Sequence, residues 1–467
     1  MNQLHPIDSS IIFGYFLFIL ILGLKRWRLD RLSDAKDFLL ASRKLTLPAF
    51  VASLVSTWYG GILGVGEFSF RYGLSNWLVL GVPYYCAAAL FGIFLARKAR
   101  SLNLYTIPHQ LERAYGQPAS LLGAFFVFVM TVPAAYVLEL AVLLKFFFGW
   151  TLWWGLIVGT ILSTSFVLIG GFRSVVRTNL AQFLLMFGSF IFLLIVAFFH
   201  YGGFSYLQTH LPAGHLNWHG DHGATYIIVW FFIALETLIE PSFYQRCFAA
   251  KTQRTAQFGI FISILFWIFF DFLTTFTGLY ARATLPDLKD PMSSYLALSQ
   301  QLLPPVALGF FFIGMLATVM STIDSYTFLA AITFGRDFLW RIKSKASPKE
   351  INRYTRIGLI LSGALAIAIA AYAGSIIRIW KDVGSIGTPA LLVPVISSLF
   401  PRLRMKRQLA LVSMAGSAIL SAIWLFSARF ASGHFFFGIE PIYPGLGFSL
   451  LMWGISQFNR HRLRLRI

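Results

Sequence analysis

Four hydroxyl side chains recur at helical spacing in the apolar stretch GMLATVMSTIDSYTFLAA, residues 314–331. Thr318, Ser321, Thr322 and Ser325 fall on one face of a helix, with Asp324 beside them. Hydroxyl and backbone carbonyl oxygens suit a hard cation such as sodium and do not titrate near neutral pH, so the group favours a metal ion over a proton. The alternative is hydrogen bonding of each hydroxyl to the carbonyl four residues earlier. Asp324 favours the ion, because a carboxylate at membrane depth is costly.

A second chemical signal is the glycine content of STWYGGILGVGEF, where Gly60, Gly61, Gly64 and Gly66 lie close together. Four glycines in a helix cost roughly 3–4 kcal/mol relative to alanine. Lipid also offers no water to backbone groups that unwinding would free. We therefore predict a broken helix that lines a cavity, and close helix packing through small residues is the alternative.

Another break is predicted in VWFFIALETLIEPSFYQR, where Glu236 and Glu240 are one helical turn apart and Pro241 follows. The stretch DVGSIGTPALLVP predicts a third irregular helix through Gly384, Gly387 and Pro389.

These stretches belong to a chain of 467 residues that is 57% hydrophobic and 12% charged, whereas soluble domains carry about 25% charged residues. A membrane-spanning helix needs about 20 mostly apolar residues. We therefore expect an all-α integral membrane protein of about thirteen transmembrane helices without a soluble domain. The predicted spans are 9–24, 46–66, 77–96, 120–147, 152–169, 180–199, 225–243, 258–279, 308–331, 357–373, 382–400, 410–427 and 441–458.

The loops between these spans alternate in basic content. Loops after odd-numbered spans, together with the tail RHRLRLRI, hold 31 of the 38 Lys and Arg residues. Basic loops resist translocation, so this side is cytoplasmic. We expect a multi-pass protein of the plasma membrane, of the bacterial inner-membrane type, with its N-terminus outside and its C-terminus in the cytoplasm. The net charge of +20 is explained by these loops, so the expected surroundings are the lipid bilayer, with no nucleic-acid partner.

The two main predicted breaks fall in the second and seventh spans, which cross the membrane in opposite directions. Interrupted helices at corresponding positions of two halves indicate an inverted repeat with a binding site at the membrane midplane. This arrangement favours a secondary transporter.

With these features the chain resembles the sodium/solute symporter family, which includes the sodium/proline and sodium/glucose symporters. Four motifs carry the resemblance, in the right order and on the right membrane side: KDFLLASRKL, GGFRSVVRTNLAQ, EPSFYQRCFAAK and MSTIDS. The resemblance implies the leucine-transporter fold, with two inverted five-helix repeats. It places a leading helix and cytoplasmic loop at 1–45, the repeats at 46–199 and 200–400, and two trailing helices with a basic cytoplasmic tail at 401–467.

The family's common sodium site uses carbonyls of the broken first core helix and, on the eighth, one carbonyl and two adjacent hydroxyls. In this chain the resemblance implies sodium ligands at Leu54, Thr57, Thr318, Ser321 and Thr322. Many relatives carry an aspartate where this chain has Asn179, and its absence favours a single coupled sodium. A second ion site rebuilt from Asn179, Asp324 and Ser325 is the alternative.

The family binds its solute beside the broken helices. The matching positions are Ser56, Trp58, Tyr59, Glu67, Tyr136, Glu139, Trp230, Glu236, Thr237 and Glu240. Ile233 and Thr237 stand where the sodium/proline symporter has aromatic residues, so the solute need not be proline. The glutamates suit a substrate with an amine or another cationic group, although each could instead form a structural hydrogen bond. Sugars, amino acids, carboxylates and vitamins stay as alternatives.

The function implied is sodium-coupled symport of a small organic solute into the cell by alternating access. Sodium is the expected coupling ion, and the chain is expected to act as a monomer and not as an enzyme. The alternatives are a proton-coupled carrier of the same fold, a transporter-like sensor and a membrane-embedded enzyme. The outside loop HLPAGHLNWHGDHG holds His210, His215, His219, Asp221 and His222. We interpret it as a polar loop, because histidines outside a helix have no fixed geometry, and expect no metal besides sodium.

Overall fold

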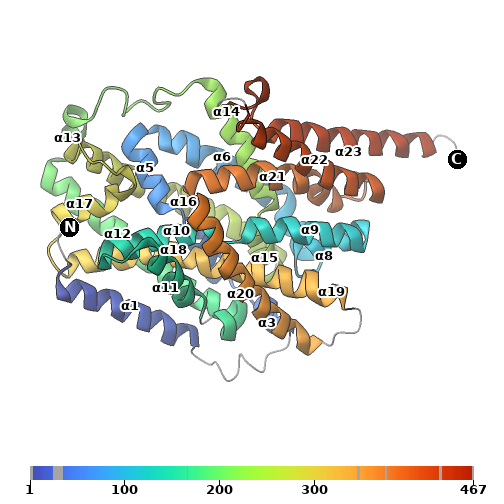
Figure 1. Ribbon diagram of the computed structural model, residues 1–467, viewed down its shortest axis with the longest axis horizontal. Coiled ribbons are helices and arrows are strands. Elements are labelled where there is room, and N and C mark those ends of the chain that lie inside the picture. Colours follow the sequence, from blue (N-terminus) through green and yellow to red (C-terminus); the bar gives the residue numbers. More distant parts are fainter. Residues whose placement is uncertain are drawn as a thin grey trace.

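The computed structural model describes residues 4–24, 35–165, 167–343, 348–373, 376–430 and 434–464. Over these residues the secondary structure is helical, apart from one isolated β-bridge between Leu45 and Ala250. The long helices form one bundle. The start of α1 (Pro6–Leu24) and the end of α23 (Ile442–Arg464) lie at opposite ends of it, as an odd number of spans requires (Figure 1). The predicted all-α architecture is confirmed.

Eleven segments of the described chain are long and apolar enough to cross a membrane, when one bent pair is counted as one span. They are α1, α4 (Leu47–Trp58) with α5 (Ile62–Tyr72), Trp77–Ser101, α9 (Gln117–Thr131) with α10 (Ala134–Phe148), α12 (Val167–Tyr201), α14 (Ala224–Ile233) with α15 (Pro241–Ala249), α16 (Gln253–Thr284), α18 (Ala307–Ile332), α20 (Pro348–Ala373), α21 (Ile376–Ser398) and α22 (Arg407–Ser427). The shorter apolar helix α11 (Leu152–Thr164) and α23 lie at the fifth and thirteenth predicted spans. Each of the thirteen predicted spans therefore corresponds to helix.

Shorter helices complete the chain. The segment Trp77–Ser101 contains α6 (Val82–Leu90) and α7 (Ala96–Ser101). The helices between spans are α3 (Ala35–Leu40), α8 (Ile107–Tyr115), α13 (Gly203–His210), α17 (Ser294–Leu302) and α19 (Trp340–Ile342).

Both main breaks are present where they are predicted. The second span divides into α4 and α5, whose axes are bent by 60°. In the seventh span, α14 ends at Ile233, a 3₁₀ turn covers Ala234–Ile239, and α15 begins at Pro241 after an extended Glu240. Proline suits the first helical position because it has no N–H to leave unpaired.

The prediction of a third irregular helix, at Gly384, Gly387 and Pro389, was wrong. The helix α21 is continuous from Ile376 to Ser398, with Pro389 and Pro394 inside it. Its glycines serve close packing, because a Cβ on Gly387 would lie 2.5 Å from the sulfur of Met130, and one on Gly384 would lie 2.9 Å from Oε2 of Glu236.

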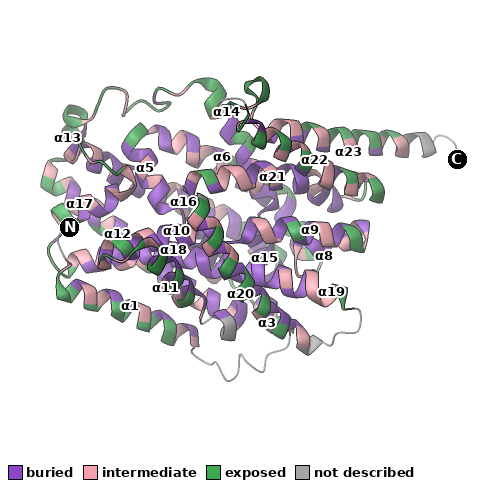
Figure 2. Ribbon diagram, viewed as in Figure 1, coloured by how far each residue is buried: buried purple, intermediate pink, exposed green. Residues whose placement is uncertain are grey.

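The helix α18 forms the centre of the bundle. Every residue from Gly314 to Thr333 is buried, and Figure 2 shows buried residues along the interior and exposed ones at the periphery. In contrast, Phe13, Leu17 and Ile21 of α1 are 57%, 58% and 62% exposed. Large apolar side chains on an outer face are expected where lipid is the solvent.

The leading helix α1 caps the start of α18. The Oδ1 atom of Asp8 accepts hydrogen bonds from the backbone N–H groups of Val306 at 2.8 Å and Gly309 at 2.9 Å. Val306 has a left-handed φ of 74° immediately before the helix. Because the first N–H groups of a helix have no partner within it, this carboxylate stabilises both the start of α18 and the position of α1.

Replacing Asp8 by alanine should remove both bonds and leave the buried Gly309 N–H and the part-buried Val306 N–H without this acceptor. We expect a loss of about 2–4 kcal/mol, since a hydrogen bond to a charged group contributes roughly 1.5–3 kcal/mol and water can partly replace the bond to the part-buried Val306 N–H. Thermal unfolding of the purified protein in detergent measures the change. Asp8→Asn keeps an oxygen acceptor and should be milder, whereas an unchanged melting temperature for Asp8→Ala would contradict the capping role.

Candidate functional site

Backbone carbonyls at the end of α4 meet hydroxyls in the middle of α18. The Ser321 hydroxyl donates to the Ser56 carbonyl at 2.8 Å, and the Thr322 hydroxyl donates to the Thr57 carbonyl at 2.8 Å. The Thr318 carbonyl also accepts from Ser321 at 2.9 Å. Because α4 stops at Trp58, the carbonyls of its last turn lack the partners that a continuing helix would supply. Three carbonyls and two hydroxyls therefore converge in one buried place.

A glycine makes this approach possible. A Cβ on Gly60 would lie 2.4–2.6 Å from the side-chain atoms of Thr322. Any other residue at position 60 would push α18 away from the end of α4. The close approach needs a glycine at this point of the break.

The five oxygens fit a sodium ion chemically. All are neutral, they come from residues at most 1% exposed, and hard cations prefer oxygen ligands. Four of the five ligands implied by the family resemblance, Thr57, Thr318, Ser321 and Thr322, are brought together. The carbonyl that Ser321 contacts is that of Ser56, two residues after Leu54. Leu54 itself is buried within α4 and stays a prediction.

Next to this oxygen cluster lies a buried guanidinium. The Nη2 atom of Arg246 donates to the hydroxyls of Thr57 at 2.8 Å, Ser325 at 3.0 Å and Ser53 at 3.1 Å. Asn179 donates to Ser325 at 3.1 Å and to Thr57 at 3.2 Å. Arg246 is fully buried, and its hydrogen-bond acceptors are neutral oxygens. Asn179 and Ser325, two members of the predicted second ion site, are therefore in contact, but the Arg246 guanidinium also occupies this place.

The third predicted member of that second site faces another helix. Asp324 is fully buried and lies near Gln182 of α12, whose amide donates to the Tyr15 hydroxyl of α1 at 3.3 Å. Among the described residues neither carboxylate oxygen of Asp324 has a hydrogen-bond partner. Successive residues on a helix point about 100° apart, so Asp324 and Ser325 serve different neighbours.

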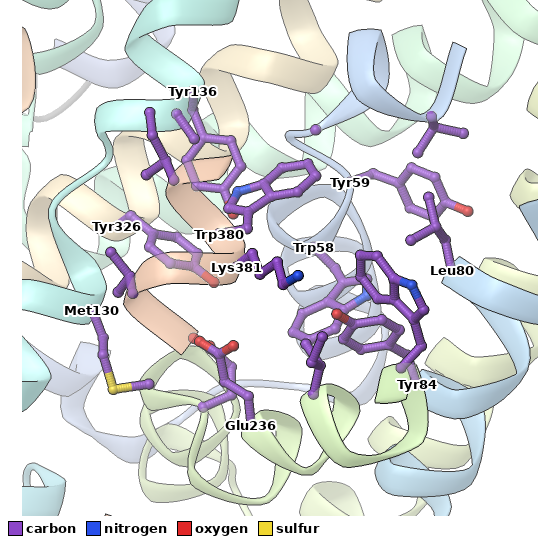
Figure 3. Close-up of a pocket in the computed structure, with 18 of the residues that line it drawn as sticks. Trp58, Tyr59, Leu80, Tyr84, Met130, Tyr136, Glu236, Tyr326, Trp380 and Lys381 are labelled. Carbon is purple, nitrogen blue, oxygen red and sulfur yellow. The ribbon is translucent and has the colours of Figure 1, made fainter. Parts of the chain in front are cut away.

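A cavity lies between the two broken helices, beside the oxygen cluster (Figure 3). Six predicted solute-binding residues line it: Trp58, Tyr59, Tyr136, Trp230, Glu236 and Glu240. Its other polar or aromatic residues are Tyr84, Tyr85, Trp267, Asp271, Tyr326, Trp380 and Lys381. Carboxylates and aromatic rings from widely separated parts of the chain therefore face one space.

Four predicted solute-binding residues lie elsewhere. Glu67 forms an ion pair with Arg71 at 3.0 Å, one turn along α5. Glu139 is fully buried in α10, and neither of its carboxylate oxygens has a hydrogen-bond partner among the described residues. Thr237 is fully buried in the 3₁₀ turn, and the Ser56 carbonyl belongs to the oxygen cluster.

Sequence reasoning missed Asp271 and Arg246. Asp271 on α16 accepts hydrogen bonds from the hydroxyls of Tyr59 and Tyr85. It is the lone acid of the apolar stretch FWIFFDFLTTF, so the membrane-depth criterion applied to Asp324 would have found it. Arg246 was assigned to a cytoplasmic loop because the seventh span was ended at residue 243, whereas α15 continues to Ala249.

The histidines of the loop 210–222 have separate neighbours. The His215 carbonyl accepts from the Leu74 N–H at 2.9 Å, and the His222 ring stacks on Tyr226 with centroids 4.5 Å apart. Burial lowers the pKa of both imidazoles, so they stay neutral at neutral pH. Within the described residues no group of three or more His, Cys, Asp or Glu side chains is arranged to hold a metal ion.

Comparison with known proteins places the chain among membrane carriers. A family model described as the sodium:solute symporter family matches residues 38–416. The osmoregulated proline transporter of Bacillus subtilis is 26% identical over 94% of this chain and 92% of its own length. The high-affinity choline transporter of Drosophila melanogaster is also 26% identical, over 95% of this chain and 74% of its own length. A substrate-bound, outward-open Na⁺-coupled sialic acid symporter has a TM-score of 0.80 at 16% identity, over 97% of each chain.

The oxygen cluster predicts distinct effects for two neighbouring glycines. Gly60→Ala should collide with Thr322 and weaken sodium binding by about tenfold or more, because it separates the two sets of oxygens. Gly64→Ala is the matched control, since its Cβ would meet only ordinary contacts from 3.6 Å. Sodium-dependent thermal stabilisation of the purified proteins measures this. Equal stabilisation of both variants would contradict the assignment.

Proposed function

Because the chain belongs to the sodium:solute symporter family, we propose that it moves a small organic solute into the cell with sodium bound between α4 and α18. Relatives in this family are transporters and not enzymes. The observation that carries the ion site is the convergence of the Ser56, Thr57 and Thr318 carbonyls with the Ser321 and Thr322 hydroxyls.

The proposed mechanism follows from what these groups join. A sodium ion bound here would be coordinated by five oxygens that come from two separate helices, α4 and α18. Ser321 and Thr322 of α18 are then held against the end of α4. This junction borders the cavity through Trp58, the residue after Thr57, and through Tyr326, one helical turn after Thr322. Alternating access in carriers with inverted repeats is a movement of one helix bundle against the rest. We assign the bundles to repeats 46–199 and 200–400.

The orientation belongs to the same proposal. We place the N-terminus outside and the C-terminus in the cytoplasm of the plasma membrane, on the evidence of the basic loops. The relatives named above transport proline and choline, so membership of the family alone does not select the solute.

Replacing either hydroxyl of the junction tests the ion site. Ser321→Ala and Thr322→Ala should each weaken binding of radioactive sodium to the purified protein by about tenfold or more, since a ligand to a charge contributes roughly 1.5–3 kcal/mol. Thr327→Ala is the control, because this buried hydroxyl of α18 bonds only along its own helix, to the Ile323 carbonyl at 2.6 Å. Unchanged sodium affinity in the first two variants would refute the site.

We further propose that one sodium ion moves per transport cycle. A guanidinium is permanently protonated, and Arg246 lies among the hydroxyls of Thr57 and Ser325 where Asn179 supplies no negative charge. Two unit charges 4 Å apart repel by about 4 kcal/mol at an effective dielectric constant near 20. A second sodium at this position would therefore face a like charge.

Equilibrium binding of radioactive sodium gives the count directly. We expect a single saturable site per chain and a transport rate that rises with sodium without cooperativity. The double variant Ser321→Ala, Thr322→Ala should lose this site entirely. Two sites per chain, or residual saturable binding in the double variant, would contradict single-sodium coupling.

A further inference from the structure

Two groups of aromatic rings face each other across the cavity. We name the first the α4 wall, in which Trp58 lies 5.7 Å from Tyr84 and 5.6 Å from Trp267 between ring centroids. The second is the α21 wall, consisting of Tyr136, Tyr326 and Trp380. In it Tyr136 lies 5.3 Å from Tyr326 and 6.1 Å from Trp380. Figure 3 shows both groups around one space.

The position of Trp380 depends on the break in the second span. A Cβ on Gly61 would lie 1.8 Å from the indole of Trp380. The glycine pair therefore has two separate effects, since Gly60 admits Thr322 to the oxygen cluster and Gly61 admits Trp380 to the cavity. An aromatic wall held in this way is fixed by the backbone of the opposite helix.

Three carboxylates line the same cavity, and two of them are already bonded. Asp271 accepts from two tyrosine hydroxyls. Glu240 accepts from the Ser242 N–H at 3.1 Å and so caps α15. Glu236 points into the cavity (Figure 3) and, among the described residues, receives no hydrogen bond from a protein donor. Its carboxylate is the negative charge left for a ligand.

The one cationic residue of the lining is already paired. Lys381 follows Trp380 on α21, and its ammonium lies 3.0 Å from Oε1 of Glu440. With Lys381 paired in this way and Asp271 and Glu240 already bonded, Glu236 is the charged group of the lining left without a protein partner among the described residues. Such a lining disfavours an anionic carboxylate solute, and a zwitterion would need Lys381 to leave Glu440.

We propose that the solute is an organic cation, an alkylated ammonium that lies between the α4 wall and the α21 wall with Glu236 as its counter-charge. Aromatic faces attract such a cation, most strongly where water is excluded, and tryptophan is the best of the aromatic side chains for this contact. A sugar would instead need several polar groups placed to bond its hydroxyls, whereas rings make up most of the polar and aromatic lining here. The inference rests on the proposed function, since it assigns a solute class to the same carrier.

The test compares three probes of similar size on the purified protein in sodium: tetramethylammonium, its zwitterionic relative trimethylglycine, and uncharged neopentyl alcohol. Tryptophan fluorescence and thermal stabilisation report binding. We expect saturable binding of tetramethylammonium at millimolar concentration or below, with the other two at least about tenfold weaker. Sodium-dependent uptake of labelled tetramethylammonium into liposomes should follow the same order.

Variants then identify the binding groups. Glu236→Gln should weaken tetramethylammonium binding by about tenfold or more, and Trp58→Leu should weaken it more than Trp58→Phe, which keeps a ring. Gly384→Ala should also weaken it, because its Cβ would displace the Glu236 carboxylate without removing the charge. Trp153→Leu is the control, since Trp153 is 60% exposed on the outside of α11.

Three results would overturn the proposal: no saturable binding of tetramethylammonium, equal binding of neopentyl alcohol, or tighter binding of trimethylglycine that Lys381→Met abolishes. The last result would indicate a zwitterion site. Radioactive sodium binding, measured on the same samples, separates these failures from failure of the ion site. Sodium binding should stay intact in Glu236→Gln. If the unaltered protein itself bound no sodium, the sodium-coupled function would be refuted.

Discussion

Inside a membrane, a backbone carbonyl that leaves its helix must find a partner, because lipid supplies none. At the end of α4 this requirement falls on Ser56 and Thr57, and the partners are the hydroxyls of Ser321 and Thr322. The rest of the site depends on this junction. The break has to contain Gly60 so that Thr322 can approach, and α18 has to be buried along its length to present its hydroxyls at that depth. Hydroxyl hydrogen bonds are also easily exchanged for contacts with a cation, since the same oxygens serve as ligands.

The junction gives a physical reason for coupling between ion and solute. On α4, Thr57 contributes its carbonyl to the oxygen cluster, and the next residue, Trp58, contributes its ring to the cavity. On α18, Ser325 contacts the Arg246 guanidinium, and the next residue, Tyr326, lines the cavity. Any movement that separates α4 from α18 must therefore alter the oxygen cluster and the cavity together. Arg246 adds a fixed positive charge beside the oxygen cluster, through its bonds to Thr57 and Ser325.

The sequence predicted what depends on local chemistry. Apolar runs of sufficient length located the spans, and glycine and proline located the two breaks. Hydroxyl spacing predicted the polar face of α18 that carries Ser321 and Thr322. Features that depend on which way a helix faces were not predictable in this way. Glu67 and Glu139 satisfied the same membrane-depth criterion as Glu236. Glu67, however, pairs with Arg71 along its own helix, and Glu139 is fully buried in α10 outside the cavity lining. The helix α21 stays continuous despite its glycines and prolines, and its glycines lie close against Met130 and Glu236. Arg246 shows the reverse error, since a basic residue counted as part of a loop is fully buried.

The central claim is that sodium joins α4 to α18 through this junction, and amide hydrogen exchange of the purified protein tests it without any knowledge of the solute. Exchange in the segments 54–62 and 318–326 should be slower in sodium than in potassium at equal ionic strength, and the two segments should respond over the same range of sodium concentration. The effect should vanish in Ser321→Ala, Thr322→Ala. Identical exchange in sodium and potassium, or protection of one segment without the other, would contradict the account.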